Sequence, residues 1–444
     1  MRVNKKEYLF LHFNHLFSLL PIILAWFYLK FKFGTWVSEA FFHLIYLLCV
    51  DIIEFIVGCN GNGENMNQIK ILHCADLHLG AELTSIGNAA RQRREEMLLT
   101  FDRIVSLCRE EKVELLLIAG DLFESSGVDI GVVHSVQKSL SEIPDTIVAI
   151  APGNHDYLSA DSPYFEEDWP ENVHIYQAGL TSFDLPEKGV RVWGTAFTGT
   201  YVTETLLPER SISEDDTIQI CVMHGDLVAE NQTSNYNPVS PVQIRFSGFD
   251  YLALGHIHKR TEILKSGATA YAYCGCPEGR GFDELGEKGV YIGTVYKGGV
   301  DLSFLPVCRR MNLEEPVDIS GAVSNNEAAE IVLRTLRQRY GARCAENLYK
   351  VILKGALDAS YTPDCAAIAM RLEKEFYYIK LKDKTHVQAD LSELAKENSL
   401  KGIFVRKMLE KIDECKSEEQ ASRCKRALYI GLKAFDSEVT LHEN

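Results

Sequence analysis

The sequence predicts an α/β protein: a layered β-sandwich flanked by helices, then a smaller α/β domain and a helical C-terminal region. Two observations predict this architecture. From Met66 onward, short runs of aliphatic and β-branched residues alternate with amphipathic helical segments. Several of these runs are apolar at nearly every position, such as VELLLIA at residues 113–119, which is typical of strands covered on both faces. A chain of 444 residues is long enough for two or three domains.

The first 65 residues differ from the rest of the chain. Residues 16–29 and 40–59 are strongly apolar and aromatic, but the first run is short for a bilayer and the second carries charged residues. They are either imperfect membrane spans or an upstream leader ahead of a natural start at Met66. A strand-like run begins directly after Met66, at residues 69–72, which favours the leader.

Strands and helices are expected in a regular alternation between residues 66 and 305. The helix at 89–112 carries an apolar face at helical spacing, and a second helix is expected at 130–140. Apolar runs predict strands at 69–75, 113–119, 146–151, 190–194, 217–223, 250–254, 268–274 and 290–296. His73 lies inside the first of these strands and is expected to be a packed core histidine rather than a ligand.

The pattern changes after about residue 306. Helices at 325–340 and 364–376 alternate with strands at 348–353 and 377–381, so residues 306–390 are expected to form a smaller α/β domain. Residues 391–444 are expected to be mostly helical, with two narrow apolar stripes. The stripes are Phe404, Met408 and Ile412, and Leu428, Leu432 and Phe435. Such stripes pack internally or dock on another protein.

Charge and cysteine content limit the possible partners and location. The formal net charge is −16, with 46 basic and 62 acidic residues, which argues against a broad basic face that grips nucleic acid. It does not argue against a nucleic-acid enzyme whose positive charge comes from metals or from a partner. The 12 cysteines form no paired C-x-x-C zinc pattern, so reduced thiols and a cytoplasmic location are expected.

Polar residues directly follow five of the predicted strands. In open α/β sheets the carboxyl ends of strands are where sites assemble, so these side chains are expected to meet. The residues are Asp76 and His78 in ADLHLG, Asp121 in GDLFE, Asn154 and His155 in GNHD, His224 in MHGDL, and His256 and His258 in LALGHIHK. One such group could be an ordinary turn, but five in succession predict a shared site. The segment GRGFDELGEKG, residues 279–289, is interpreted as a glycine-rich loop, from which Arg280 could touch phosphate.

These residue types are metal ligands. Imidazole, carboxylate and amide oxygen together suit divalent ions such as those of manganese, iron or zinc. Two Asp, one Asn and four His are too many ligands for one ion, but they suit two ions that share a carboxylate. Two metal ions about 3.5–4 Å apart can activate a water and clamp both oxygens of a phosphoryl transfer.

The motif set D-x-H, G-D, G-N-H-D, H and G-H-x-H resembles the calcineurin-like metallophosphoesterase superfamily. KILHCADLHLG, LLLIAGDLFE, APGNHD and LALGHIHK narrow the resemblance to the SbcD family of DNA repair exonucleases. The Asp-Arg-Gly expected of protein phosphatases is absent, since Phe123, Glu124 and Ser125 stand there. The resemblance covers about residues 70–296, and implies a metallophosphoesterase-type β-sandwich.

The resemblance implies a role for each motif residue. Asp76, His78 and His258 would bind one metal ion, Asn154, His224 and His256 a second, and Asp121 would bridge the two. His155 would not be a ligand and would stabilise or protonate the departing oxygen. Asp156 either orients His155 or caps backbone N–H groups of the turn.

The resemblance also implies cofactors and partners. Family members use two divalent ions, Mn²⁺ in particular, to cleave DNA, form homodimers, and pair with an SbcC-type ATPase through C-terminal helices. Residues 306–390 would then be a cap that helps to select DNA, and a membrane would be a partner only if the N-terminal extension is genuine. The alternatives are a dimetal phosphodiesterase that acts on a nucleotide or another small phosphodiester, and an ATPase partner without catalysis.

Overall fold

The computed structural model describes residues 67–208, 212, 215–230, 232–358, 360–387 and 391–436. The chain divides into two compact units, Met1–Met66 and Asn67–Asn444. The first unit, with both apolar runs and the choice between leader and membrane segment, lies outside the described residues. Within the described part of the chain, no helix is long and apolar enough to cross a membrane.

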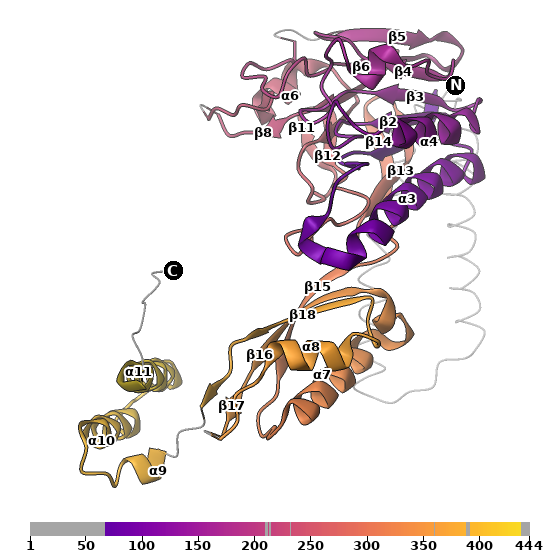
Figure 1. Cartoon of the computed structure of the whole chain (residues 1–444). Coiled ribbons are helices and arrows are strands. Elements are labelled where there is room, and N and C mark those ends of the chain that lie inside the picture. The colour runs from indigo at the N-terminus through magenta and orange to yellow at the C-terminus, as the bar shows by residue number, and fades with distance from the viewer. Residues whose placement is uncertain are drawn as a thin grey trace, which may run out of the picture. The chain divides into compact units, whose positions relative to one another are not determined.

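The first β-sheet has six strands with a parallel centre (Figure 1). Strands β1 to β4 run parallel to one another, while β13 and β14 are added antiparallel at one side. In spatial order the strands are β14 (Gly299–Pro306), β13 (Gly289–Tyr296), β1 (Gln68–Cys74), β2 (Leu115–Ile118), β3 (Ile147–Ile150) and β4 (Val173–Ile175). The carboxyl ends of β1, β2 and β3 therefore lie side by side.

A second six-stranded sheet also has a parallel centre. Its four inner strands pair in parallel, and an antiparallel strand closes each edge. In spatial order the strands are β11 (Leu264–Ser266), β12 (Thr269–Tyr273), β10 (Tyr251–Gly255), β7 (Ile218–His224), β6 (Val190–Gly194) and β5 (Thr181–Leu185). A two-stranded ladder follows β7, formed by β8 (Asp226–Leu227) and β9 (Pro238–Val239).

The core is layered because alternate residues of a strand point to opposite faces. In β2, Leu116 and Ile118 pack in a buried cluster with the helices α3 and α4, which lie side by side in Figure 1. Leu115 and Leu117 instead pack in a cluster with residues of the second sheet. The outer face of the second sheet packs against α6 through Ile244. This arrangement confirms the predicted α/β fold of sheets flanked by helices.

The longest helix of this part is α3, with 21 residues. The helices are η1 (Thr84–Ala89), α3 (Ala90–Glu110), α4 (Ile130–Ser141), α5 (Pro163–Glu166), η2 (Pro186–Lys188) and α6 (Pro241–Ser247). The predicted apolar face of α3 is buried, with Phe101 and Ile104 almost fully enclosed. Asp129 caps α4 by accepting a hydrogen bond from the backbone N–H of Gly131 at 2.9 Å.

A separate three-stranded parallel sheet follows in the sequence, in the order β15-β16-β18. Its core is a cluster of its own in which Val332 and Ile368, from two helices, pack on Tyr349 and Val351 of the central strand. The elements are β15 (Asn312–Asp318), α7 (Asn325–Tyr340), η3 (Gly341–Glu346), β16 (Leu348–Lys354), β17 (Ala356–Leu357), α8 (Cys365–Leu372), β18 (Tyr378–Asp383) and β19 (His386–Val387). The alternation of helix and strand predicted here is present.

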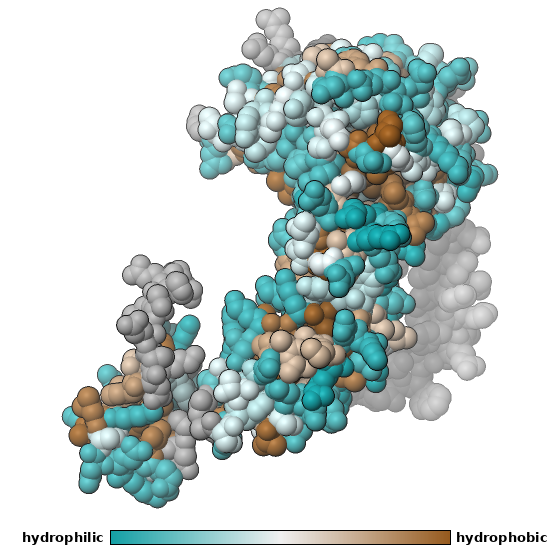
Figure 2. All heavy atoms as spheres, viewed as in Figure 1, coloured by the Kyte–Doolittle hydropathy of each residue, from teal (hydrophilic) through white to brown (hydrophobic). Residues whose placement is uncertain are grey.

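The last described elements are the helices α9 (Leu391–Leu394), α10 (Leu400–Asp413) and α11 (Glu418–Asp436). The two predicted apolar stripes pack against each other around Val405, Leu428 and Leu432. Both stripes therefore pack internally except at Phe435, which is 42% exposed. Other hydrophobic side chains of this pair remain exposed, and Figure 2 shows hydrophobic residues gathered on its surface. They include Leu400, Ile403, Tyr429 and Ile430.

His73 is a core residue that links the two large sheets, as the sequence predicted. Its side chain is fully buried, and Nδ1 lies 2.9 Å from the hydroxyl of Tyr251 on β10. Burial lowers the pKa of His73 to about 3. The folded protein therefore keeps this imidazole neutral at pH values where the unfolded chain, with a His pKa of about 6.5, binds a proton.

We expect His73 to make stability depend on pH. Between pH 6.5 and about 3 the unfolded state binds the additional proton, so the free energy of unfolding falls as pH falls. From pH 8 to pH 5 this one group should cost about 2 kcal/mol. Urea unfolding of wild type and His73→Gln at both pH values measures it: the variant should lose less stability than the wild type on acidification. Equal losses in the two proteins would contradict this role of His73.

Candidate metal centre

Five strand ends deliver all the predicted site residues to one place. Asp76 and His78 follow β1, Asp121 follows β2, Asn154 and His155 follow β3, His224 ends β7, and His256 and His258 follow β10. The two sheets that contribute them face each other across a shared core. Residues far apart in the sequence therefore meet at the carboxyl ends of both sheets.

Asp76, His78 and His258 form the first group of possible ligands, whose atoms lie within 4.8 Å of one another. The Nε2 atoms of His78 and His258 are 3.2 Å apart, and Nε2 of His258 lies 3.9 Å from Oδ1 of Asp76. The three ligand atoms thus converge on one point.

Asn154, His224 and His256 form the second group. Oδ1 of Asn154 lies 3.0 Å from Nε2 of His224 and 3.2 Å from Nδ1 of His256. The other ring nitrogen of His224 is 3.0 Å from the carbonyl oxygen of Ala119. Because a carbonyl only accepts, Nδ1 of His224 carries a hydrogen, and Nε2 is the nitrogen that faces the site and could bind a metal ion in place of a proton.

Asp121 lies between the two groups. Its Oδ2 is 3.6 Å from Nε2 of His78 in the first group and 3.3 Å from Nε2 of His224 in the second. Its Oδ1 accepts a hydrogen bond from the backbone N–H of His155 at 2.9 Å. One carboxylate therefore contacts both groups, as a bridging ligand must.

The backbone that presents the ligands is strained. Four of the site residues have left-handed backbone conformations: Asp76 with φ 55°, His78 with φ 47°, Asp121 with φ 50° and His256 with φ 105°. Such conformations cost about 1–3 kcal/mol each and cluster at functional sites. Gly120 also has a positive φ, and a Cβ there would lie 2.2 Å from Nδ1 of His224. Only glycine allows the ring to approach this closely.

The electrostatics of the site favour a bound cation. Burial acts to raise the pKa of Asp121, but the charge and hydrogen bond of His224 outweigh it and hold the pKa well below its usual range. Burial likewise opposes a charge on His224, yet Asp121 raises its pKa to about 9. Oδ2 of Asp76 is buried with no hydrogen-bond partner among the described residues. An enclosed anion and an unpaired buried oxygen are what a divalent ion would neutralise, so the residues fit a metal.

His155 lies beside this cluster with its ring anchored. Nδ1 lies 3.0 Å from the carbonyl oxygen of Glu124, and the ring packs edge-on against His78 at 4.7 Å between centroids. The carbonyl requires Nδ1 to carry the hydrogen, which leaves Nε2 of the neutral ring free to exchange a proton.

Asp156 does not contact the imidazole of His155 and instead caps backbone groups. Its Oδ1 accepts from the N–H of Gly153 at 2.7 Å, and its Oδ2 accepts from the N–H of Leu122 at 2.8 Å and from the hydroxyl of Tyr164 at 2.6 Å. The carboxylate therefore shapes the turn that carries Asn154. Of the two roles left open by the sequence, the structure supports the capping role.

Beside the motif residues the structure places Glu124 and Glu284, which the sequence motifs did not indicate, and Arg280, which the sequence offered as a phosphate contact. Glu284 lies 2.5 Å from Nδ1 of His258, and Arg280 contacts both carboxylates. They line a pocket of about 770 Å³ beside the site. Glu284 comes from the segment interpreted as a glycine-rich loop. No spacing rule connects it to His258, so only the fold could identify the contact.

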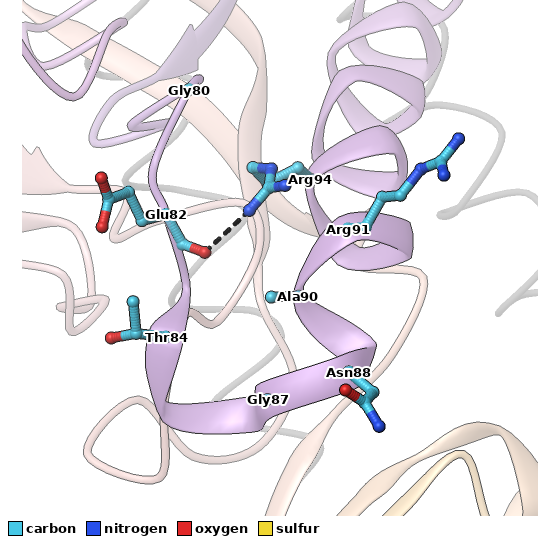
Figure 3. Close-up of a pocket in the computed structure, with 8 residues that line it drawn as sticks. All are labelled: Gly80, Glu82, Thr84, Gly87, Asn88, Ala90, Arg91 and Arg94. Carbon is cyan, nitrogen blue, oxygen red and sulfur yellow. Dashed lines mark hydrogen bonds between the residues drawn. The ribbon is translucent and has the colours of Figure 1, made fainter.

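A neighbouring pocket of about 720 Å³ lies at the start of α3 (Figure 3). It shares Gly80, Glu82 and Thr84 with the first pocket, so the two adjoin. Figure 3 shows Arg94 reaching back from α3 to the segment before η1, where it donates to the carbonyl oxygen of Glu82 at 2.9 Å. This hydrogen bond joins the segment that follows His78 to helix α3.

Residues 69–260 match the family model of calcineurin-like phosphoesterases. This segment of the chain is similar in sequence to calcineurin-like phosphoesterases. Every residue of both ligand groups lies within the matched segment. Divalent metal ions and phosphoric-ester hydrolysis are properties of that superfamily, and the matched segment holds two groups of suitable ligands.

Several curated proteins are similar to this chain. The uncharacterized metallophosphoesterase YhaO of Bacillus subtilis is 24% identical over 350 residues, covering 74% of this chain and 85% of that protein. The DNA double-strand break repair protein Mre11 of Methanopyrus kandleri is 29% identical over 277 residues, covering 54% and 57%. The SbcD component of the nuclease SbcCD of Bacillus subtilis is 25% identical over 256 residues, covering 49% and 64%. The chain spans less than two thirds of the latter two.

Proposed function

We propose that this chain is a metal-dependent phosphodiesterase that hydrolyses DNA, as the nuclease subunit of an SbcCD-like repair complex. The observation that carries the proposal is the position of Asp121, whose Oδ2 contacts His78 and His224 of the two ligand groups. Similarity to Mre11, a DNA double-strand break repair protein, and to the SbcD component of a nuclease supports DNA as the substrate.

Each ligand group would hold one ion. Asp76, His78 and His258 would bind the first, Asn154, His224 and His256 the second, and Asp121 both, with Mn²⁺ the expected metal. When bound, the two ions would supply Lewis-acid activation of water and neutralise charge on the phosphoryl oxygens.

His155 would act on the leaving group. Its Nδ1–H is fixed by the carbonyl of Glu124, so a proton taken up at Nε2 can be donated to the departing sugar oxygen. The hydrogen bond from the backbone N–H of His155 to Asp121 fixes the position of His155 relative to the ligands. The turn capped by Asp156 holds it rigidly, as proton transfer requires.

The rest of the chain would select substrate and partner. We propose that residues 66–305 form the phosphoesterase domain, residues 306–390 a cap that helps to select DNA, and residues 391–444 a docking region for an SbcC-type ATPase. The exposed apolar side chains of α10 and α11, including Leu400 and Ile403, would make that contact. A homodimer in the cytoplasm is the expected form.

A second candidate function is hydrolysis of a nucleotide or another small phosphodiester by the same site. The net charge of −16 favours it, since an acidic protein attracts DNA poorly without a partner. The smaller α/β domain of residues 306–390 and the helical C-terminal region favour DNA, because a small substrate needs neither.

A substrate comparison with a matched variant tests the proposal. Wild type and His155→Ala are assayed with Mn²⁺ on labelled duplex DNA, single-stranded DNA and a small chromogenic phosphodiester, with and without an SbcC-type ATPase. Loss of general acid catalysis should lower kcat by roughly 10²–10⁴-fold, while Mn²⁺ content stays at the wild-type level. Cleavage of the small diester with both DNAs untouched, even with the ATPase, would contradict the nuclease and leave the second candidate.

A further inference from the structure

Two of the predicted metal ligands have a carboxylate behind the ring. Nδ1 of His258 lies 2.5 Å from Oε1 of Glu284. Nδ1 of His78 lies 3.0 Å from Oε2 of Glu124, although this contact is poorly aligned for a hydrogen bond. In each contact one partner is buried, His78 fully and Glu284 at 7% exposed, while Glu124 and His258 are 35% and 23% exposed. The contact between Glu284 and His258 is therefore the better shielded from water.

These contacts determine where the ring hydrogens are. Nδ1 of His258 lies between a donor, Nη2 of Arg280 at 3.1 Å, and an acceptor, Glu284 at 2.5 Å. The contact with Glu284 is the shorter, and an ionised carboxylate only accepts, so Nδ1 carries the hydrogen and Nε2 has a lone pair. The contact of Nδ1 of His78 with Glu124 favours the same arrangement more weakly. The two Nε2 atoms, 3.2 Å apart, then face each other with two lone pairs and no hydrogen to share. This arrangement is repulsive alone and becomes favourable when a cation lies between the nitrogens.

Arg280 ties the two carboxylates together. Its Nη1 donates to Oε2 of Glu124 at 3.0 Å, and its Nη2 lies 3.4 Å from Oε1 of Glu284 and 3.1 Å from Nδ1 of His258. Its backbone N–H also donates to Oε2 of Glu284 at 2.6 Å. Both oxygens of Glu284 are therefore occupied, and the side chain has one orientation in which it can reach His258.

We propose that Glu284 and Glu124 are positioning residues for the metal centre: they fix the rings of His258 and His78 with Nε2 facing the first metal ion, and Arg280 fixes them. The proposal rests on the proposed dimetal function. Loss of these carboxylates is expected to weaken only the first metal site, because the ring of His224 in the second group is oriented by the carbonyl oxygen of Ala119. Glu284 should matter more than Glu124, since its contact is shorter and better aligned.

Glu284 could alternatively be a ligand of a separate ion, because His258, Cys276 and Glu284 also lie within 4.8 Å of one another. One observation argues against that site: both oxygens of Glu284 are already engaged by Arg280 and His258.

Mn²⁺ binding to the full chain tests the proposal without any substrate. Equilibrium dialysis should find two Mn²⁺ per wild-type chain. Glu284→Ala should weaken one of the two sites by roughly 10–100-fold and leave the other unchanged. Glu284→Gln should be affected less, since its amide oxygen can still accept from His258. Glu124→Ala should weaken the same site by a smaller factor. Loss of one ion should also remove the electron-spin coupling between paired Mn²⁺ ions.

Glu262→Ala is the matched control, because Glu262 is close to His258 in the sequence but its side chain is 81% exposed and pairs only weakly with Arg260 at 3.4 Å. It should bind two Mn²⁺ like the wild type. Two unchanged sites in Glu284→Ala would overturn the inference, as would equal weakening of both sites. A wild-type chain that binds no Mn²⁺ would overturn the proposed function itself, so the two failures are distinguishable.

Discussion

Replacing Asp121 with alanine is expected to abolish phosphodiester hydrolysis, with a loss of at least about 10³-fold in kcat/KM. Its Oδ2 contacts a ring nitrogen of the first group, Nε2 of His78 at 3.6 Å, and one of the second, Nε2 of His224 at 3.3 Å. Without the carboxylate both ion sites lose a ligand and the negative charge that favours a cation. Mn²⁺ dialysis and hydrolysis of the chromogenic diester, measured on the same preparation, check the prediction.

Asp121→Asn distinguishes the effect of the negative charge at residue 121 from the effect of the size and shape of its side chain. The amide keeps the size of the side chain and one acceptor oxygen for the N–H of His155, at 2.9 Å in the wild type, but removes the charge. If charge shared between two ions is the cause, Asn should be nearly as inactive as Ala. Asp301→Ala, an exposed carboxylate on β14, is the control and should keep full activity. Hydrolysis by Asp121→Ala within tenfold of wild type would contradict a bridging role.

The convergence of the candidate ligands could be predicted from sequence because the position of each is set by local structure. An apolar run predicts a strand, and the polar residue after it marks the strand's carboxyl end. Asp76, Asp121 and Asn154 each follow this rule, and parallel pairing of β1, β2 and β3 brings them together. The strand at 69–75 and the helix at 89–112 differ from the structure by at most two residues at either end.

The missed features depend on contacts between distant segments. Edge strands such as β5 and β11 are mostly exposed on both faces, so they lack the apolar pattern that marks a buried strand. Glu284 lies 26 residues after His258, and its role depends on where a loop crosses the site. The role of Asp156 also remained open until the fold placed backbone N–H groups around its carboxylate. Local patterns predict strand ends, but not which side chains approach from other segments.

Replacing Arg93 with methionine is expected to destabilise the fold by about 3–5 kcal/mol, because it leaves a buried carboxylate without its cation. Arg93 is 1% exposed and contacts a carboxylate oxygen of Glu278, and it donates to the carbonyl of Gly279 at 3.2 Å. Burial already raises the pKa of Glu278 even with Arg93 present. Denaturant unfolding at pH 7.5 compares the free energy of unfolding of the variant with that of the wild type.

The pH dependence of that loss identifies its cause. Removing Arg93 raises the pKa of Glu278 in the folded state further above its value in the unfolded state. The loss in free energy of unfolding is therefore complete above the folded-state pKa. It disappears as pH falls toward about 4, where the unfolded carboxyl also binds a proton. The difference between variant and wild type should therefore shrink on acidification. Adding Glu278→Gln should recover most of the lost stability, because Thr100 and the N–H of Arg309 can still bond a neutral amide. A deficit that is the same at all pH values and is not rescued would instead assign the role of Arg93 to packing of its aliphatic stem.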